Sequence, residues 1–97
     1  KQYLFREWMQ EDLRRVMRVR KQNLGNKNLV GSRVEQLRHA AGMRQKELLA
    51  QLQVRGISIN ASGLSKLEGQ LRSVSDYELR ALAEVFDVPI EDLFPKE

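Results

Sequence analysis

Hydrogen-bonding side chains and very small residues share one short run of the sequence, NASGLSK, at positions 60–66. The polar members of the run are Asn60, Ser62, Ser65 and Lys66. The small members are Ala61, Ser62 and Gly63. Amide, hydroxyl and ammonium groups can bond base edges or phosphates, and an alanine methyl can touch a thymine methyl. The chemistry of this run is therefore recognition by non-covalent contacts, although an ordinary capped helix with a small first turn has the same pattern.

Catalytic and metal chemistry lack the residues that they need. His39 is the only histidine and there is no cysteine, so the chain offers neither a set of metal ligands nor a thiolate nucleophile. No base is spaced to activate the serines near position 60. The carboxylates of the C-terminal region have the spacing of a solvated helix face, and they are Asp76, Glu78, Glu84, Asp87, Glu91 and Asp92. We therefore expect no enzyme activity, no metal and no cofactor.

Positive and negative charges are concentrated in different parts of the chain. The net charge is +4, and residues 1–72 contain 15 of the 17 Lys and Arg, whereas residues 73–97 contain 7 of the 13 Asp and Glu. A molecule polarised in this way attracts polyanions to one side. Nucleic acid is one partner that fits this field, and an unevenly charged solvated surface is the alternative interpretation.

The hydrophobic periodicity predicts an all-α chain, because apolar residues recur at helical spacing and no stretch alternates convincingly with a period of two. The predicted helices cover residues 3–22, 29–41, 45–53, 61–68 and 76–86, with a last short turn at 90–94. Asn60 and Ser75 are expected N-caps, and Glu78 completes a capping box with Ser75. Gly42 and Gly69 follow two of the helices directly, where a left-handed residue is favoured. The inward positions expected within residues 29–41 are Val34, Leu37 and Ala41.

The helices predicted at 45–53 and 61–68 are short and consecutive, which is typical of a helix-turn-helix motif. In this motif the second helix enters the major groove of DNA end-first, and bulky residues in its first turn would block it. We expect Leu64 and Leu67 to point into the core, while Lys66 extends from the exposed side of the same helix.

Between about residues 30 and 94 the chain resembles the Cro/phage-repressor family of helix-turn-helix DNA-binding regulators. The matching segments are VGSRVEQLRHAAGMRQKELLAQL (30–52), INASGLSKLEGQLRSVS (59–75) and YELRALAEVFDVPIEDLF (77–94). The pattern combines a glycine after the first helix, a Gln-x-x-Leu start to the second and a Leu-Ser-Lys-Leu-Glu-Gly recognition helix. The resemblance implies a five-helix domain, here preceded by an additional amphipathic helix.

The resemblance also implies roles for individual residues. The positions that contact bases in the family are occupied here by Ala61, Ser62 and Lys66. Gln45 and Arg72 correspond to residues that contact the DNA backbone. Arg38 and Glu68 correspond to a buried pair whose role is structural. Breaking such a pair costs about 3–5 kcal/mol, because one charge is left buried without a partner.

Two features depart from the family pattern. The turn before the recognition helix contains VRGISI (54–59), about four residues more than usual, so we expect the preceding helix to gain a turn and to end near Gly56. Arg44 stands where Ser or Thr usually caps that helix. Arg44 offers no cap acceptor but adds a cation that can contact a phosphate.

The chain is expected to divide into residues 1–28 and the DNA-binding domain at 29–97. The first part contains a basic amphipathic helix and the linker NLGNKN (23–28). The apolar side of this helix suits packing on a second copy or on the domain itself, a protein partner or a membrane surface. A marginal helix that belongs only in part to the native protein is another interpretation. No apolar run is long enough to span a membrane, and no signal peptide is evident, so we expect a cytoplasmic protein without a membrane partner.

These patterns together predict a sequence-specific regulator of transcription, expected to be a repressor that binds double-stranded DNA as a homodimer at a two-fold-symmetric operator. The alternative is an antitoxin or another partner-binding protein whose DNA binding is autoregulatory.

Overall fold

The computed structural model describes residues 23–95, and this part of the chain consists of helices and connecting loops without a strand. The α-helices are α2 (Gly31–Ala40), α3 (Gln45–Val54), α4 (Ala61–Glu68) and α5 (Asp76–Phe86), followed by a 3-10 helix, η1 (Ile90–Leu93). The prediction of an all-α chain is confirmed for these residues. The helix expected at 3–22 lies outside the described residues.

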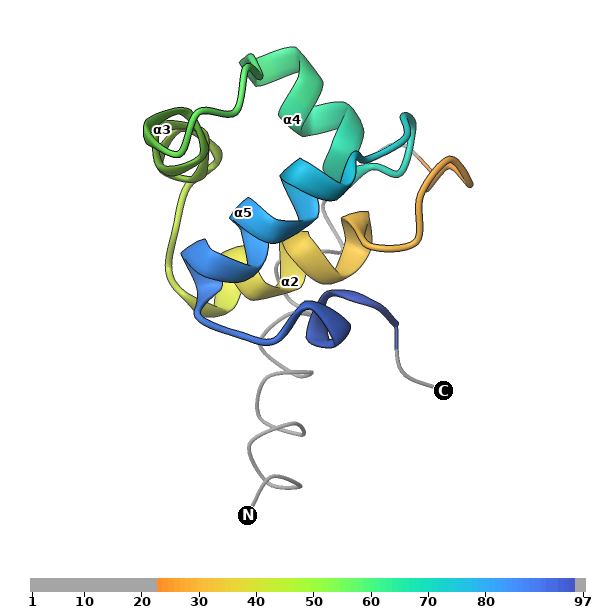
Figure 1. Cartoon of the computed structure of the whole chain (residues 1–97). Helices are drawn as coiled ribbons and strands as arrows, with labels where there is room; N and C mark the ends of the chain where they lie inside the picture. The colour runs from red at the N-terminus through yellow and green to blue at the C-terminus, as the bar shows by residue number, and fades with distance from the viewer. Residues whose placement is uncertain (1–22, 96–97) are drawn as a thin grey trace.

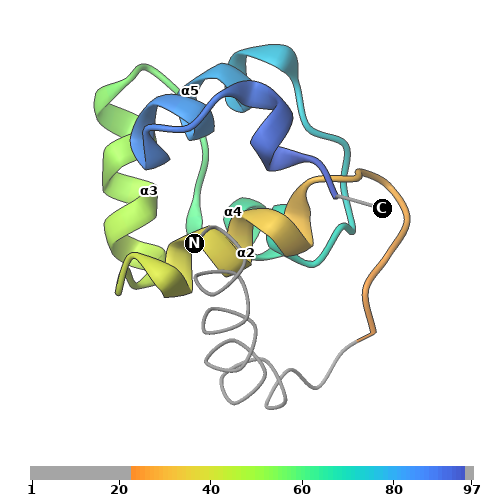
Figure 2. The ribbon, with the colours of Figure 1, turned by 90° about the horizontal axis from the view of Figure 1, so that it is seen from below.

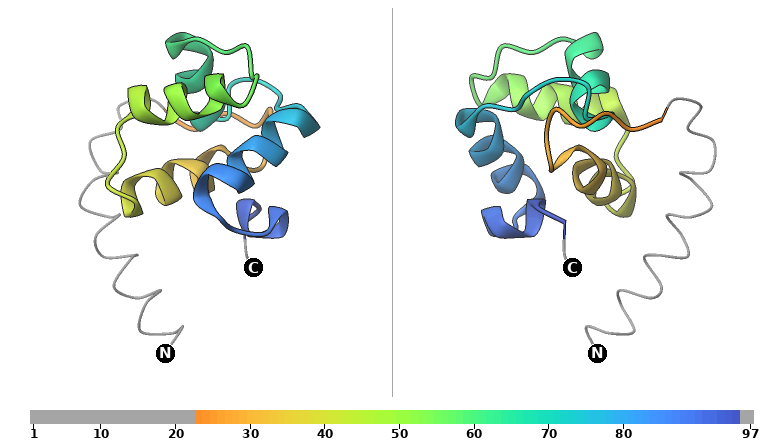
Figure 3. Two further views of the ribbon diagram at one scale, coloured as in Figure 1. Left: turned by 60° about the vertical axis from the view of Figure 1, so that its left-hand side comes forward. Right: turned by 90° about the vertical axis from the view of Figure 1, so that its right-hand side faces the viewer.

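α3 and α4 pack against each other at one end of the described domain (Figure 1). α4 packs against α2 and α3, whereas α5 packs against α2, α3 and η1. Seen from below, η1 lies in front and α4 lies behind α2 (Figure 2). The two side views keep α4 and η1 at opposite ends (Figure 3). One face of α4 is therefore not covered by any other helix of residues 23–95.

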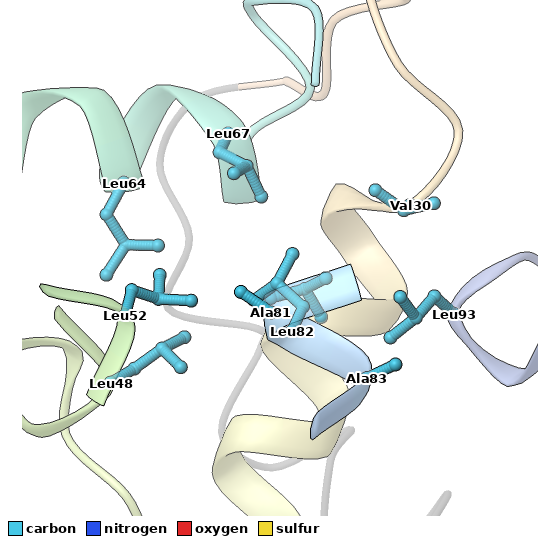
Figure 4. Packing of buried hydrophobic residues seen from close by; sticks show 10 residues of the cluster. Val30, Leu48, Leu52, Leu64, Leu67, Ala81, Leu82, Ala83 and Leu93 are labelled. Carbon is cyan, nitrogen blue, oxygen red and sulfur yellow. The ribbon is translucent and has the colours of Figure 1, made fainter. Parts of the chain in front are cut away.

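The core is made mainly of leucines that the helices contribute at helical spacing (Figure 4). α3 provides Leu48 and Leu52, and α4 provides Leu64 and Leu67, all of which are at most 1% exposed. Leu82 of α5 is fully buried as well. Burying one such side chain contributes about 1.5–3 kcal/mol, so these contacts fix α4 firmly on the rest of the domain.

One predicted core position is wrong. Ala41 is exposed, because it is the C-cap of α2 at the point where the chain leaves the helix. Arg38 is buried instead, three residues earlier in α2, together with Val34. An arginine can occupy this place because its guanidinium finds a buried carboxylate, as described below.

The helices end in turns whose key residue is left-handed. Gly42 follows α2 with φ +68°, as predicted, and Gly56, near which α3 was expected to end, has φ +85°. The expectation for Gly69 is shifted by one residue, since Gly69 has φ −81° and Gln70 has φ +60°. Leu71 N–H donates to Lys66 O at 2.8 Å and so closes the turn at Gln70. A residue with a side chain is thus held in a conformation that favours glycine.

Candidate nucleic-acid interface

The outer face of α4 carries most of the residues predicted to contact DNA. Asn60 caps the helix, and its Oδ1 accepts a hydrogen bond of 2.7 Å from Gly63 N–H. The exposed positions of this segment are Asn60, Ala61, Ser62, Ser65 and Lys66. Residues 61 and 65, like residues 62 and 66, are one turn apart and so lie on the same side of the helix. Small, hydroxyl and ammonium groups therefore share one solvent-facing surface, which we call the α4 face.

The structure shows which small residues are needed for packing within the chain. Ala61 and Ser62 are exposed, so the packing of the described residues does not require small side chains there. Gly63 is half-buried, and a Cβ on it would lie 3.2 Å from Asn60 Oδ1 and 3.3 Å from Ile59 Cγ1. Packing against Asn60 and Ile59 thus favours glycine at position 63. Ala61 and Ser62, in contrast, face solvent in the first turn of α4.

The long turn before α4 is anchored rather than loose. α3 ends at Val54, two residues before Gly56, and the extra residues form the connection 55–60. Ile57 and Ile59 pack against the core, and Gln53 Nε2 donates to Ile59 O at 3.0 Å. These contacts fix the direction in which the chain enters α4.

A buried charge cluster ties the end of α4 to α2 and α3. Glu68 is fully buried, and its Oε2 accepts from Arg38 Nε at 2.7 Å. Glu68 Oε1 accepts from Arg38 Nη2 at 3.1 Å and from Gln45 Nε2 at 2.9 Å. Arg38 Nη1 also donates to Met43 O at 2.9 Å. The structure therefore places the predicted pair of Arg38 and Glu68 in a bidentate contact, which is the strong geometry for such pairs.

Gln45 belongs to this cluster as well as to the predicted DNA contacts. Its side chain is half-buried at the start of α3, with one amide N–H directed to Glu68. A primary amide has a second N–H and a carbonyl oxygen, so a phosphate contact stays a prediction. Its position shows that the first turn of α3 lies beside the last turn of α4.

Arg72 makes its contacts within the domain. Its Nε donates to Gly63 O at 3.1 Å, and its Nη1 donates to Ser73 O at 2.7 Å. Nη1 and Nη2 donate to the two oxygens of Glu78 at 3.1 and 2.7 Å. Burial opposes ionisation of the Glu78 carboxyl, but hydrogen bonds from Arg72 and from the Ser75 backbone, with the Arg72 charge, lower its pKa below the usual value. Arg72 thus links α4 to α5.

Within residues 23–95, five exposed cations make no ion pair with another described residue, and they are Lys27, Arg44, Lys46, Lys66 and Arg80. Arg44 and Lys46 flank Gln45 at the start of α3. Arg44 does not cap α3 with its side chain. Glu47 supplies the cap contact instead, since its Oε1 accepts from Arg44 N–H at 2.7 Å. The Arg44 guanidinium is therefore available for an anionic partner.

Asn28 is a structural residue that the sequence analysis missed, because it lies in the segment expected to be a linker. Its Oδ1 accepts from the N–H groups of Val30 and Gly31 at 3.0 and 2.8 Å, which caps α2. Its Nδ2 donates to Leu67 O at 3.1 Å and to Arg72 O at 2.8 Å. The only signal in the sequence is an asparagine shortly before a helix, a residue type that satisfies helix N-termini.

The linker segment makes further contacts with the same part of the domain. Gly25 N–H donates to Gly69 O at 2.8 Å, and Lys27 N–H donates to Gln70 O at 2.9 Å. A Cβ on Gly25 would lie 2.3 Å from Gln70 O, so the close approach requires glycine. Residues 25–28 therefore support the C-terminal end of α4 directly.

The described residues form neither a metal site nor a membrane-spanning helix. Across residues 23–95 no group of three or more His, Cys, Asp or Glu side chains is placed to hold a metal ion. None of the described helices has both the length and the apolar character to cross a bilayer.

No protein-family model, no curated protein and no solved structure matches this chain.

Proposed function

We propose that this chain is a sequence-specific DNA-binding regulator of transcription that inserts α4 into the major groove. The observation that carries the proposal is the α4 face. Ala61 and Ser62 are small where the domain's own packing sets no limit, and Lys66 is exposed between the buried Leu64 and Leu67. A surface of this kind allows close approach of base edges and offers donors to them.

Electrostatics supports a polyanionic partner. Arg44 and Lys46 lie at the start of α3, which is next to the end of α4 through the contact of Gln45 with Glu68. Cations there can contact the phosphates that flank a groove occupied by α4. Two of the acidic side chains, Glu91 and Asp92, belong to η1, which lies at the opposite end of the described domain from α4 (Figure 3).

A homodimer acting as a repressor completes the proposal. One copy of so small a domain makes few phosphate contacts, and two copies on symmetric half-sites double them. Repression follows if the bound operator overlaps a promoter, and a cytoplasmic location is part of the same proposal. No cofactor is part of the proposal.

Selection of binders from a random duplex DNA library at near-physiological salt tests the proposal. We expect an enriched two-fold-symmetric motif and an affinity that falls steeply with salt as counterions are released. Retention without any sequence preference would contradict the proposal, and so would the absence of binding.

Lys66→Ala tests the role of the α4 face in the same assay. Loss of a base contact would cost about 1–3 kcal/mol and change the preferred base at one position of the motif. Uniform weakening across sequences would make Lys66 a phosphate contact, and unchanged binding would remove it from the interface. Arg80→Gln is the control, because it removes a positive charge from α5, where Arg80 lies 5.7 Å from the Tyr77 ring centre. We expect this variant to keep the motif.

A partner-binding protein of the antitoxin type is the second candidate. Exposed apolar side chains in the segment 23–29 favour this second candidate, since Leu24 is 45% and Leu29 65% exposed. Such side chains are typical of a surface that another protein covers. Co-expression with the product of the neighbouring gene, followed by purification through this chain, distinguishes the candidates. A stable complex that neutralises a toxic product would favour the second.

A further inference from the structure

The guanidinium of Arg72 lies between the first turns of α4 and the start of α5. It contacts Gly63 O in α4, Ser73 O in the connection and the Glu78 carboxylate in α5. Its side chain is 27% exposed and that of Glu78 is 13% exposed. Arg72 is therefore partly withdrawn from solvent and surrounded by acceptors of its own domain.

The donors of Arg72 are almost all used. A guanidinium has about five N–H groups, and the four hydrogen bonds described above occupy all but one of them. Its charge is matched by the bidentate contact with Glu78, a geometry that is about twice as strong as a neutral hydrogen bond. A phosphate in contact with Arg72 would have to compete with a carboxylate already in place.

The hydrogen bond from Arg72 Nε to Gly63 O connects this arginine to the first turn of α4. The peptide groups on either side of Gly63 are both engaged, since its N–H donates to Asn60 Oδ1 and its C=O accepts from Arg72. Gly63 lies between the exposed Ser62 and the buried Leu64, in the turn that carries the α4 face. Fixing this glycine fixes the direction of that face relative to α5.

We infer that Arg72 and Glu78 form a positioning pair that orients the first turn of α4, and that Arg72 is not one of the phosphate contacts. The inference rests on the proposed function and deepens it. It assigns the electrostatic contact with DNA to exposed cations that make no ion pair with another described residue, among them Arg44 and Lys46 on either side of Gln45.

The direction in which Glu78→Gln changes the affinity for DNA distinguishes a positioning role of Arg72 from a phosphate contact. If Arg72 contacted a phosphate, neutralising its carboxylate partner would free the guanidinium and leave DNA binding equal or tighter. A positioning pair predicts the reverse, a loss of about tenfold in affinity for the preferred site with relaxed base preference, because the bidentate contact is weakened. Glu91→Gln is the matched control, since it removes the same charge from an exposed site in η1. We expect it to keep the preference.

The salt dependence of Arg72→Gln provides the second measurement. Each phosphate contact contributes about 0.9 to the slope of log K against log salt concentration. We expect Arg72→Gln to weaken binding to the preferred site about tenfold with the wild-type slope, whereas Arg44→Gln lowers the slope. A slope reduced by about 0.9 in Arg72→Gln, or tighter binding in Glu78→Gln, would overturn the inference.

Amide hydrogen exchange of the DNA-free protein tests the positioning role without DNA. We expect Arg72→Gln and Glu78→Gln to accelerate exchange in residues 63–65 more than in α3, at a pH and temperature where circular dichroism shows all variants folded. Wild-type exchange at these positions in both variants would overturn the inference. If the wild type shows no sequence preference for DNA, the proposed function fails, and this exchange measurement alone decides the positioning role.

Discussion

Replacing Asn28 by alanine removes a side chain that joins two distant parts of the domain. The amide makes two hydrogen bonds to the N-terminus of α2 and two to the carbonyl groups of Leu67 and Arg72. Each bond contributes about 0.5–1.5 kcal/mol net, and the site is half-buried, so that solvent replaces only part of what is lost. Allowing for this partial replacement, we expect the free energy of unfolding to fall by about 2–4 kcal/mol.

Urea denaturation followed by circular dichroism measures this loss. Asn26→Ala is the matched control, because Asn26 is exposed in the same segment and we expect a change below about 0.5 kcal/mol there. Asn28→Asp adds a second comparison, since it keeps the acceptor for α2 but loses both donors to the carbonyl groups. We expect it to be destabilised too. If Asn28→Ala were as stable as Asn26→Ala, the four bonds would not be stabilising the protein and the reasoning would be wrong.

Three further predictions concern single residues. A Cβ on Gly31 would lie 2.2 Å from Leu67 O, so Gly31→Ala should lower the free energy of unfolding by about 1–3 kcal/mol despite the better helix propensity of alanine. Ser32→Ala is the control, and a Gly31→Ala variant more stable than the wild type would disprove the close approach of α2 to α4. Asp87 has φ +55° at the end of α5, and Asp87→Gly should raise the midpoint of thermal unfolding by stabilising the protein about 0.5–1 kcal/mol; a lower midpoint would contradict the strain argument. The pKa of Glu78 is lowered in the folded protein, so the unfolded chain binds more protons at this site. The ionised carboxylate therefore contributes fully to the free energy of unfolding above the ordinary pKa of 4.5, and this contribution is lost as the pH falls through the lowered pKa. Denaturation at a series of pH values should show that the free energy of unfolding falls less below pH 4.5 in Glu78→Gln than in the wild type. Identical pH profiles of the two proteins would exclude a stabilising role for the carboxylate.

Local signals in the sequence were sufficient for the described helices. Asn60 at the start of α4 and Ser75 with Glu78 at the start of α5 are caps that act on residues two or three positions away, so their effect is visible in the sequence itself. The predicted bounds of α4 agree with the structure, and its buried leucines follow from helical spacing. The exposed positions of the α4 face follow from the same periodicity.

Contacts between segments far apart in the chain were decided only by the tertiary structure. Whether Arg72 faces a phosphate or Glu78 depends on how α4 and α5 meet, and nothing in the residue types alone chooses between two anionic partners. Asn28 is an ordinary loop residue until folding brings Leu67 O and Arg72 O within reach of its amide. Gln70 likewise takes the left-handed place that Gly69 was expected to fill, and its Oε1 accepts from Ser32 N–H at 3.1 Å. The sequence determines helices through interactions over a few residues, whereas the partners of long polar side chains are set by packing across the whole domain.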